Sequence, residues 1–290
     1  MNSTLKKILV PIDFSEQSLI ALNQSYNLAR HFNAEITLLY VIEELDIISK
    51  IFSKHADETI KKTIQEKLDV LVAETEKKSK VTVTSLIAKG AVYEKIVELA
   101  EVLNATFIIM GCTNKKKFIG SNALRVVREA NCAVITIHGK QHRDGCKNIV
   151  LPLDLTKETK EKVSKAIELA KSGTGAAIRI VSVLFTTDEF IVNKLTRQLT
   201  QVKHFIESMD IVCTAEIIKS TKGHESLAHS ILDYANKVEA DLIMIMTQQE
   251  VDFTKYFIGS AAQEIINNSN IPVMSIIPSI KKDTSSFTPY

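Results

Sequence analysis

Short apolar runs rich in β-branched residues alternate along the first half of the chain with longer stretches of helical periodicity. Such runs predict strands buried on both faces of a sheet, and the amphipathic stretches predict helices that cover it. We expect strands at residues 7–15 (ending in a turn), 35–42, 81–88, 105–111 and 132–138. We expect helices near residues 15–33, 43–80, 93–103 and 122–131. This alternation predicts an α/β domain whose parallel strands are joined by right-handed crossovers.

The second half of the chain repeats the first. Residues 148–156 match residues 7–15 position by position, with Pro152 in place of Pro11 and Asp154 in place of Asp13. Further strands are expected at 177–184, 212–218, 241–246 and 272–277. One helix is expected to end at residue 173, and others are expected at 188–209, at 226–238 and after residue 260. The polar segment 141–147 is the predicted linker, so we place one domain at residues 1–142 and another at 143–290. Residues 279–290 lack periodicity, which favours a mobile tail.

Composition narrows the class of protein. The chain has 290 residues, and its 36 basic and 34 acidic side chains leave a formal net charge of +2, which gives no reason to expect nucleic acid as a partner. No apolar run is long enough to span a bilayer, so no membrane association is expected. The four cysteines are scattered without C-x-x-C spacing. This pattern favours a reduced, cytoplasmic protein.

A strand-loop-helix unit occurs once in each half. The strand at 105–111 is followed by a polar loop, and Gly120-Ser121 opens the next helix. The strand at 241–246 is likewise followed by a loop and by Gly259-Ser260. Ligands of open α/β sheets bind beyond the carboxyl ends of strands, and the amides that begin a helix favour an anion. The unit therefore predicts an anion site in each half.

Four motifs together resemble the universal stress proteins. They are V-P-I-D at the end of the first strand, Tyr40-Val41, I-I-M-G at 108–111, and Gly-Ser before the last helix. The chain resembles a tandem member with two UspA-like domains, and the likeness covers residues 6–277. The resemblance implies two five-stranded parallel-sheet domains of the Rossmann-like, adenine nucleotide alpha hydrolase-like kind. It also implies a stress-response role and possible binding of ATP or AMP, with no metal beyond a nucleotide-bound Mg.

The resemblance also implies which residues hold the nucleotide. In nucleotide-binding members an aspartate after the first strand and a valine after the second hold adenine and ribose. A loop wraps the phosphates; its sequence is G-x-x-G, then nine residues, then G-[ST]. Glycines suit this task because the backbone can approach the phosphate oxygens. The implied residues of the first half are Pro11, Ile12, Asp13, Val41, Gly111, Asn114, Gly120, Ser121 and Asn122. Those of the second half are Asp154, Val183, Gly259 and Ser260.

Both halves depart from the family's phosphate loop. Eight residues lie between Gly111 and Gly120, where the family pattern has twelve, and Asn114 replaces the second glycine. In the second half the spacing is right, but Met246 and Gln249 replace the first two glycines. A Met side chain at that position should crowd the phosphate path. We therefore expect a degenerate site in the second half.

Each candidate also has an ordinary structural interpretation. Asp13 and Asp154 could serve only to turn the chain after a strand. Ser121 and Ser260 could be N-caps rather than ligand donors. The lysines at 115–117 could neutralise phosphates or simply be solvated.

Evidence for catalysis or a metal site is weak. Cys112 follows Gly111, where a nearby helix start could lower its pKa, although a passive loop cysteine is the simpler interpretation. His224 and His229 lie five apart, which is not a helical metal pair. There is no Walker-type G-K-[ST], so any ATP hydrolysis should be slow. Two functions remain open: nucleotide binding in the first half, or an interaction or scaffold protein of the same fold that binds none.

The resemblance further implies that the two domains pair through their final strands. Those strands begin at Ala133 and Val273 and end at Ile137 and Ile277. The chain would then imitate a homodimer. Further self-association into a homo-oligomer is also compatible with the sequence, and no protein partner can be named.

Overall fold

The computed structural model describes residues 5–43, 54–112, 121–139, 147–154, 159–172, 175–219, 226–246, 248–249, 256–257 and 259–277. The first half contains β1 (Lys6–Pro11), α1 (Glu16–Phe32), β2 (Ala34–Ile42), α2 (Lys54–Ser79), β3 (Val83–Lys89), α3 (Val92–Val102), β4 (Phe107–Gly111), α4 (Ser121–Glu129) and β5 (Ala133–Ile137). The second contains β6 (Asn148–Pro152), α5 (Thr159–Lys171), β7 (Ala177–Leu184), α6 (Glu189–Glu207), β8 (Cys213–Lys219), α7 (Leu227–Lys237), β9 (Leu242–Met246), β10 (Gln248–Gln249), β11 (Tyr256–Phe257), α8 (Ser260–Asn268) and β12 (Val273–Ile276). Both halves thus have the predicted alternating α/β order.

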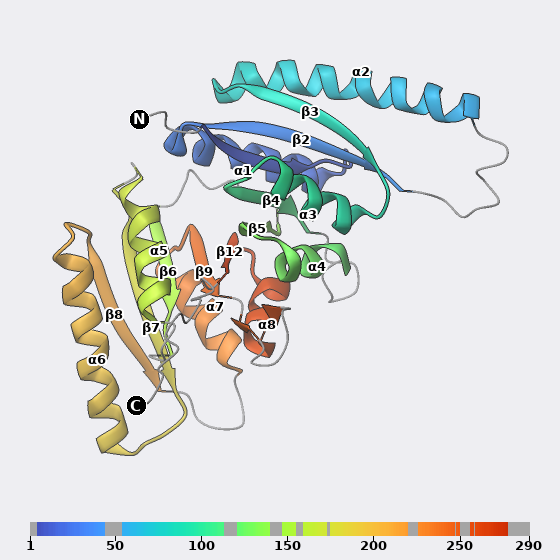
Figure 1. Cartoon of the computed structure of the whole chain (residues 1–290). Helices are drawn as coiled ribbons and strands as arrows, with labels where there is room; N and C mark the ends of the chain where they lie inside the picture. Colours follow the sequence, from blue (N-terminus) through green and yellow to red (C-terminus); the bar gives the residue numbers. More distant parts are fainter. Residues whose placement is uncertain are drawn as a thin grey trace, which may run out of the picture.

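Ten of the twelve described strands, five from each half, form one continuous sheet (Figure 1). Its order is β3-β2-β1-β4-β5-β12-β9-β6-β7-β8, which places the two final strands side by side at the centre. Within this sheet the strands of each half are parallel to one another, whereas β5 and β12 are antiparallel, with Ile135 opposite Met274. The expected contact between the final strands is therefore present, and β12 ends at Ile276 rather than Ile277.

Helices cover both faces of this sheet. On one face, Leu22 of α1 and Leu68 of α2 pack with apolar side chains of α5 and α6. On the other face, Ile96 of α3 and Val126 of α4 pack in a cluster that also includes α7 and α8. All four named side chains are at most 1% exposed. Burial of a side chain of this size contributes about 1.5–3 kcal/mol, so strands that are apolar on both faces stabilise a three-layer structure.

The structure differs from the expected elements in a few places. The short antiparallel pair β10–β11 lies in a segment expected to be a loop. The helix expected from residue 43 is described from Lys54, and residues 44–53 lie outside the described part. Residues 141–146 of the predicted linker at 141–147 and the tail at 279–290 also lie outside it. None of the described helices is long and apolar enough to cross a membrane.

Candidate functional site

A cavity of about 200 Å³ lies at the carboxyl ends of β1, β2 and β4. This is where an open α/β sheet binds its ligands. Helices α3 and α4 and the start of α1 close its sides. The lining residues are Pro11, Ile12, Asp13, Ser15, Ser18, Leu39, Val41, Val92, Ile96, Met110, Gly111, Cys112, Asn122 and Ala123. The structure thus brings together six residues of the first half that the sequence singled out: Pro11, Ile12, Asp13, Val41, Gly111 and Asn122.

Asp13 is held by the turn that leads into α1. The Ser15 amide donates a hydrogen bond of 2.9 Å to Asp13 Oδ1. Ser15 is also the N-cap of α1, because its Oγ accepts from the Ser18 amide at 3.3 Å. Partial burial raises the pKa of Asp13, but hydrogen bonds from Ser15 and Ser18 outweigh burial and place this pKa below its ordinary value. Asp13 is therefore a turn residue, as its ordinary interpretation states, and also an exposed, ionised carboxylate at the mouth of the cavity.

Gly111 faces α1. A Cβ atom built there would lie 2.2 Å from the backbone oxygen of Gln17 and 2.9 Å from the Ser18 amide nitrogen. No side chain fits at such distances, so this glycine allows the first turn of α1 to lie directly against the end of β4. Packing against the helix is a sufficient reason for glycine at this position, whether or not a phosphate approaches.

Met246 stands where the first half has Gly111, and its side chain is buried rather than in a ligand path. It is 5% exposed and belongs to the core cluster that includes Leu153 and Val163. Leu242 and Met244, at alternate positions of the same strand, lie in the same cluster. The side chain therefore lies on the face that α5 covers. The expectation that it crowds a phosphate path is wrong, because in a strand the side-chain direction alternates and this position faces the core.

Asp154 has a lysine partner, whereas Asp13 forms no ion pair with a described lysine or arginine. Lys162 Nζ lies 3.8 Å from Asp154 Oδ1, and the lysine side chain is only 11% exposed. Counted from the two aspartates, Lys162 stands where the first half has Ala21, which is fully buried against the sheet. The second half thus directs an ammonium group of its own at the carboxylate that a ligand would need.

The remaining predicted residues are placed as follows. Asn114 and Gly120 lie outside the described residues; Ser121 begins α4, but its side chain is not described. Val183 is half-buried on β7. Gly259 is the N-cap residue of α8, and Ser260 is the first helical residue. The interpretation of Ser260 as the N-cap is therefore wrong.

Sequence reasoning missed several residues that line the cavity. They are Ser18, Leu39, Val92, Ile96, Met110 and Ala123. Two signals could have found some of them: Val92 and Ile96 are four apart and so share a helix face, and Met110 lies on the strand face opposite to that of Gly111. The sequence alone does not say which sheet face the cavity adjoins.

Cys112 is a structural cysteine. It is 4% exposed, and burial raises the pKa of its thiol to about 12, so the group stays protonated near neutral pH. The possibility of a lowered pKa is wrong, and the passive interpretation holds.

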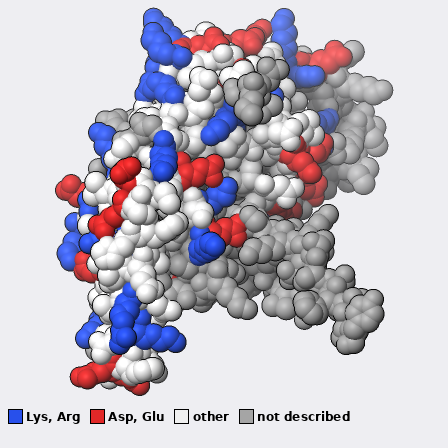
Figure 2. All heavy atoms as spheres, turned by 60° about the vertical axis from the view of Figure 1, so that its left-hand side comes forward, with Lys and Arg blue, Asp and Glu red and all other residues white. Residues whose placement is uncertain are grey.

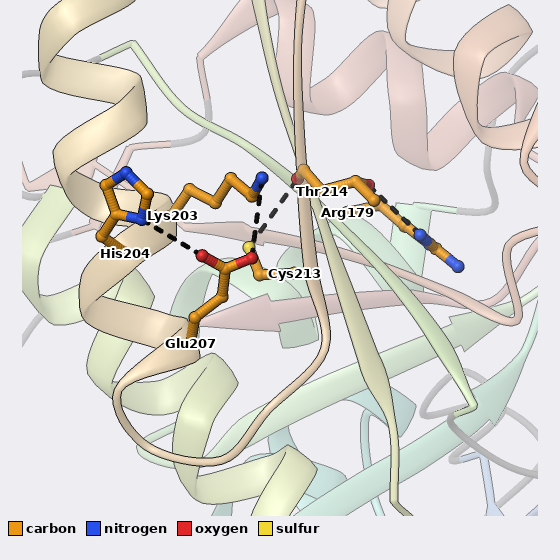
Figure 3. Close-up of polar contacts among 6 residues, drawn as sticks. All are labelled: Arg179, Lys203, His204, Glu207, Cys213 and Thr214. Carbon is orange, nitrogen blue, oxygen red and sulfur yellow. Dashed lines mark hydrogen bonds and ion pairs between the residues drawn. The ribbon is translucent and has the colours of Figure 1, made fainter.

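A second polar cluster, where α6 meets β8, does not form a catalytic pair. Figure 3 shows Cys213 and Arg179 on opposite sides of the strand. His204 Nδ1 lies 3.2 Å from Glu207 Oε2. Burial raises the pKa of the Cys213 thiol to about 11. Arg179 Nη1 donates to the Thr214 hydroxyl at 3.3 Å. The first contact therefore lies within α6, and the contact of Arg179 with Thr214 joins β7 to β8.

The described residues contain no group of three His, Cys, Asp or Glu side chains that could hold a metal. His229 instead faces Asp233, with 3.3 Å between Nε2 and Oδ2. On the face drawn in Figure 2, basic and acidic side chains are interspersed rather than gathered by sign. This face offers no broad basic surface for a nucleic-acid backbone.

Comparison with known proteins identifies the family. The model of the universal stress protein family matches residues 4–138 and again residues 145–276. The chain belongs to the universal stress protein family. The two matches correspond to the two halves of the sheet, so this is a universal stress protein with two family domains in tandem.

Relatives agree with this assignment. Universal stress protein MJ0531 of Methanocaldococcus jannaschii is 29% identical over 147 residues, which cover 46% of this chain and 81% of that protein. Universal stress protein MJ0577 of the same organism is 30% identical over 161 residues, covering 48% and 99%. A solved universal stress protein from Archaeoglobus fulgidus has a TM-score of 0.76 at 20% identity, covering 94% of this chain and 97% of that one. This last similarity shows that the whole two-domain fold occurs in another protein.

Proposed function

We propose that this universal stress protein is a regulatory binding protein of the stress response that takes one adenine nucleotide, in the cavity of its first half. The observation that carries the proposal is the convergence of Asp13, Val41 and Asn122 on one cavity at the carboxyl ends of β1, β2 and β4. The apolar lining from Leu39 and Ile96 suits the face of a purine base, and a carboxylate can accept hydrogen bonds from ribose hydroxyls.

The size of the cavity supports a nucleoside within it rather than a whole triphosphate. Its volume of about 200 Å³ is below the range of about 300–1,000 Å³ that small-molecule sites occupy. The phosphates would have to extend toward the segment 113–120, which lies outside the described residues. We therefore expect AMP and ATP to bind with similar affinity. We propose binding in the cytoplasm, with at most slow hydrolysis.

We propose that the second half binds no nucleotide. The support is the ion pair between Lys162 and Asp154, because an aspartate already facing an ammonium group has less capacity to accept from a ribose. The replacement of the second glycine of its loop by Gln249 is further support, because a glycine allows closer approach of the backbone to a phosphate.

Isothermal titration of the full chain with AMP and with ATP tests the proposal. We expect one equivalent of nucleotide per chain. Asp13→Asn should weaken binding about tenfold, since a hydrogen bond to a charged group is replaced by one to a neutral group. The matched change in the second half, Asp154→Asn, should leave the affinity unchanged.

The alternative function makes the opposite prediction. An interaction or scaffold protein of the same fold would give no heat at millimolar nucleotide with either compound, and that result would exclude the proposed function. Two equivalents per chain, with one lost in Asp154→Asn, would mean that the second half is competent and that the ion pair of Lys162 does not prevent binding.

A further inference from the structure

A larger cavity lies at the junction of the two halves, away from the proposed nucleotide site. Its volume is about 420 Å³, which is within the range of small-molecule sites. From the first half it is lined by Lys6, Phe32, Thr106, Phe107, Asn131, Cys132 and Ala133. From the second half it is lined by Lys165, Glu168, Leu169, Met244, Met274, Ile276 and Ile277. We call this cavity the junction groove.

The junction groove lies at the opposite end of β1 and β4 from the nucleotide cavity. Lys6 is the first residue of β1, and Thr106 directly precedes β4. Pro11 and Gly111, which line the nucleotide cavity, are the last residues of the same strands. A ligand in the groove would therefore not compete directly with a nucleotide.

The walls of the groove are apolar and largely buried. The Phe32 and Phe107 rings pack with their centroids 4.9 Å apart, and Met244 and Met274 are at most 2% exposed. Methionine side chains adapt to ligands of different shape because they are unbranched and polarisable. The walls therefore suit a flexible apolar body.

Among the described residues, the charged groups of the groove leave one lysine without a carboxylate partner. Lys165 Nζ forms an ion pair with Glu168 Oε2 at 3.1 Å. Lys6 Nζ lies 4.4 Å from the centroid of the Phe32 ring and forms no ion pair with any described carboxylate. With two lysines and one glutamate, the lining carries a net charge of plus one. One unpaired ammonium at the edge of an apolar cavity complements a single anionic group on an apolar molecule.

We propose that the junction groove binds a monoanionic amphiphile, an apolar chain that carries one carboxylate, with Lys6 as the residue that recognises the carboxylate. The ligand contacts both halves, so its binding stabilises their association. This inference does not depend on the proposed nucleotide site.

Methyl NMR of the full chain with ¹³C-labelled methionine tests this proposal, because methionines mark each cavity separately. Decanoate, kept below its micelle concentration, should shift the methyl signals of Met244 and Met274 and leave that of Met110, which lines the nucleotide cavity, in place. AMP should do the reverse. If one ligand fails to bind, the methionine signals of the other cavity still report whether the other ligand binds.

Variants and analogues test the role of Lys6. Lys6→Ala should weaken decanoate binding about tenfold, and Lys6→Arg should keep most of the affinity. The matched lysine of the second half, Lys147, lies outside the groove lining, so Lys147→Ala should change nothing. Decanol should bind wild type about as weakly as decanoate binds Lys6→Ala, and decylammonium should bind more weakly still.

Three results would overturn the proposal. The first is the absence of any shift at Met244 and Met274 with decanoate. The second is equal binding of decanoate and decylammonium, which would make the groove merely apolar. The third is binding only after removal of residues 279–290, which would mean that the chain's own C-terminal segment is the occupant.

Discussion

Gly111 has no room for a side chain. Gly111→Ala places a methyl carbon about 2.2 Å from the Gln17 oxygen, so β4 or the first turn of α1 must move. Overpacking of this kind costs about 1–3 kcal/mol, and we expect the free energy of unfolding to fall by that amount in urea titrations. Because Asp13 precedes the same turn, nucleotide affinity should fall as well.

A glycine in open space provides the control for this change. Gly175 has φ +57°, and a Cβ built there meets nothing within 4 Å. Asn adopts this left-handed conformation more readily than other non-glycine residues, so Gly175→Asn should cost less than about 1 kcal/mol, from backbone strain alone. Equal effects of the two substitutions would contradict the packing explanation for Gly111.

His138 couples stability to pH. It is 2% exposed, and neither ring nitrogen makes a hydrogen bond of normal geometry with the described residues, so the contact with the Ile266 backbone is weak. Burial lowers its pKa, and the backbone of Ile266 opposes this by less. In the unfolded chain the imidazole takes up a proton near pH 6.5, whereas in the folded chain it does so at lower pH. The contribution of neutral His138 to the free energy of unfolding is thus fully present above about pH 6.5. It is lost as the pH falls from there toward the pKa of His138 in the folded chain.

His138→Leu removes this titration. We expect the variant to lose less stability than wild type between pH 6.5 and 5.5, with a difference of at most about 1.4 kcal/mol per pH unit. Urea unfolding at both pH values measures it. If the free energies of unfolding of wild type and His138→Leu changed in parallel with pH, the buried imidazole would not be the titrating group.

At the scale of elements, two helices begin with the same kind of cap. Ser15 caps α1 through the Ser18 amide, and Ser226 caps α7 through the His229 amide at 3.1 Å. Ser15→Ala and Ser226→Ala should each lower the free energy of unfolding by about 1 kcal/mol, because an amide at the helix start loses its acceptor. Ser164, an exposed serine within α5, is the control: Ser164→Ala should be neutral or slightly stabilising. A cap variant as stable as that control would contradict the expectation.

The order of elements could be predicted from the sequence because the apolar runs and the repeat of Pro11 and Asp13 at Pro152 and Asp154 mark corresponding positions in both halves. The pair β10–β11 could not, since two residues per strand are too few for a period to be visible. The direction of the Met246 side chain was predicted wrongly for a related reason. In a strand buried on both faces every position is apolar, so the pattern does not reveal which face α5 covers.

The candidate site shows the same division. Asp13 and Val41 could be found from their places after predicted strands, and the cavity contains both. Lys162 could not, because its meeting with Asp154 depends on how α5 is rotated over the sheet. Charged residues on an amphipathic helix predict a solvated face, and only the packed structure shows one of them buried against a strand end.

At the scale of the whole molecule, the two halves behave as one body because the sheet runs through both. The pairing of β5 with β12 places Ile135 opposite Met274, and the core cluster that contains these two residues extends into both halves. A protease site inserted in the linker at 141–146 should therefore cut the chain without separating the halves. Size-exclusion chromatography after cleavage should give one peak that contains both fragments, since an apolar strand pair covered by helices is costly to expose.

A charge at the junction provides the decisive variant for this prediction. Met274→Asp places a carboxylate at a position that is 2% exposed, opposite Ile135, and after cleavage we expect its fragments to elute apart. Val212 is 65% exposed next to β8, at the far edge of the sheet, and Val212→Asp should leave the cleaved halves together. Separation of the wild-type fragments would mean that the covalent linker, rather than the β5–β12 contact, holds the halves together. A ligand of the junction groove would then be needed to stabilise the association of the cleaved halves.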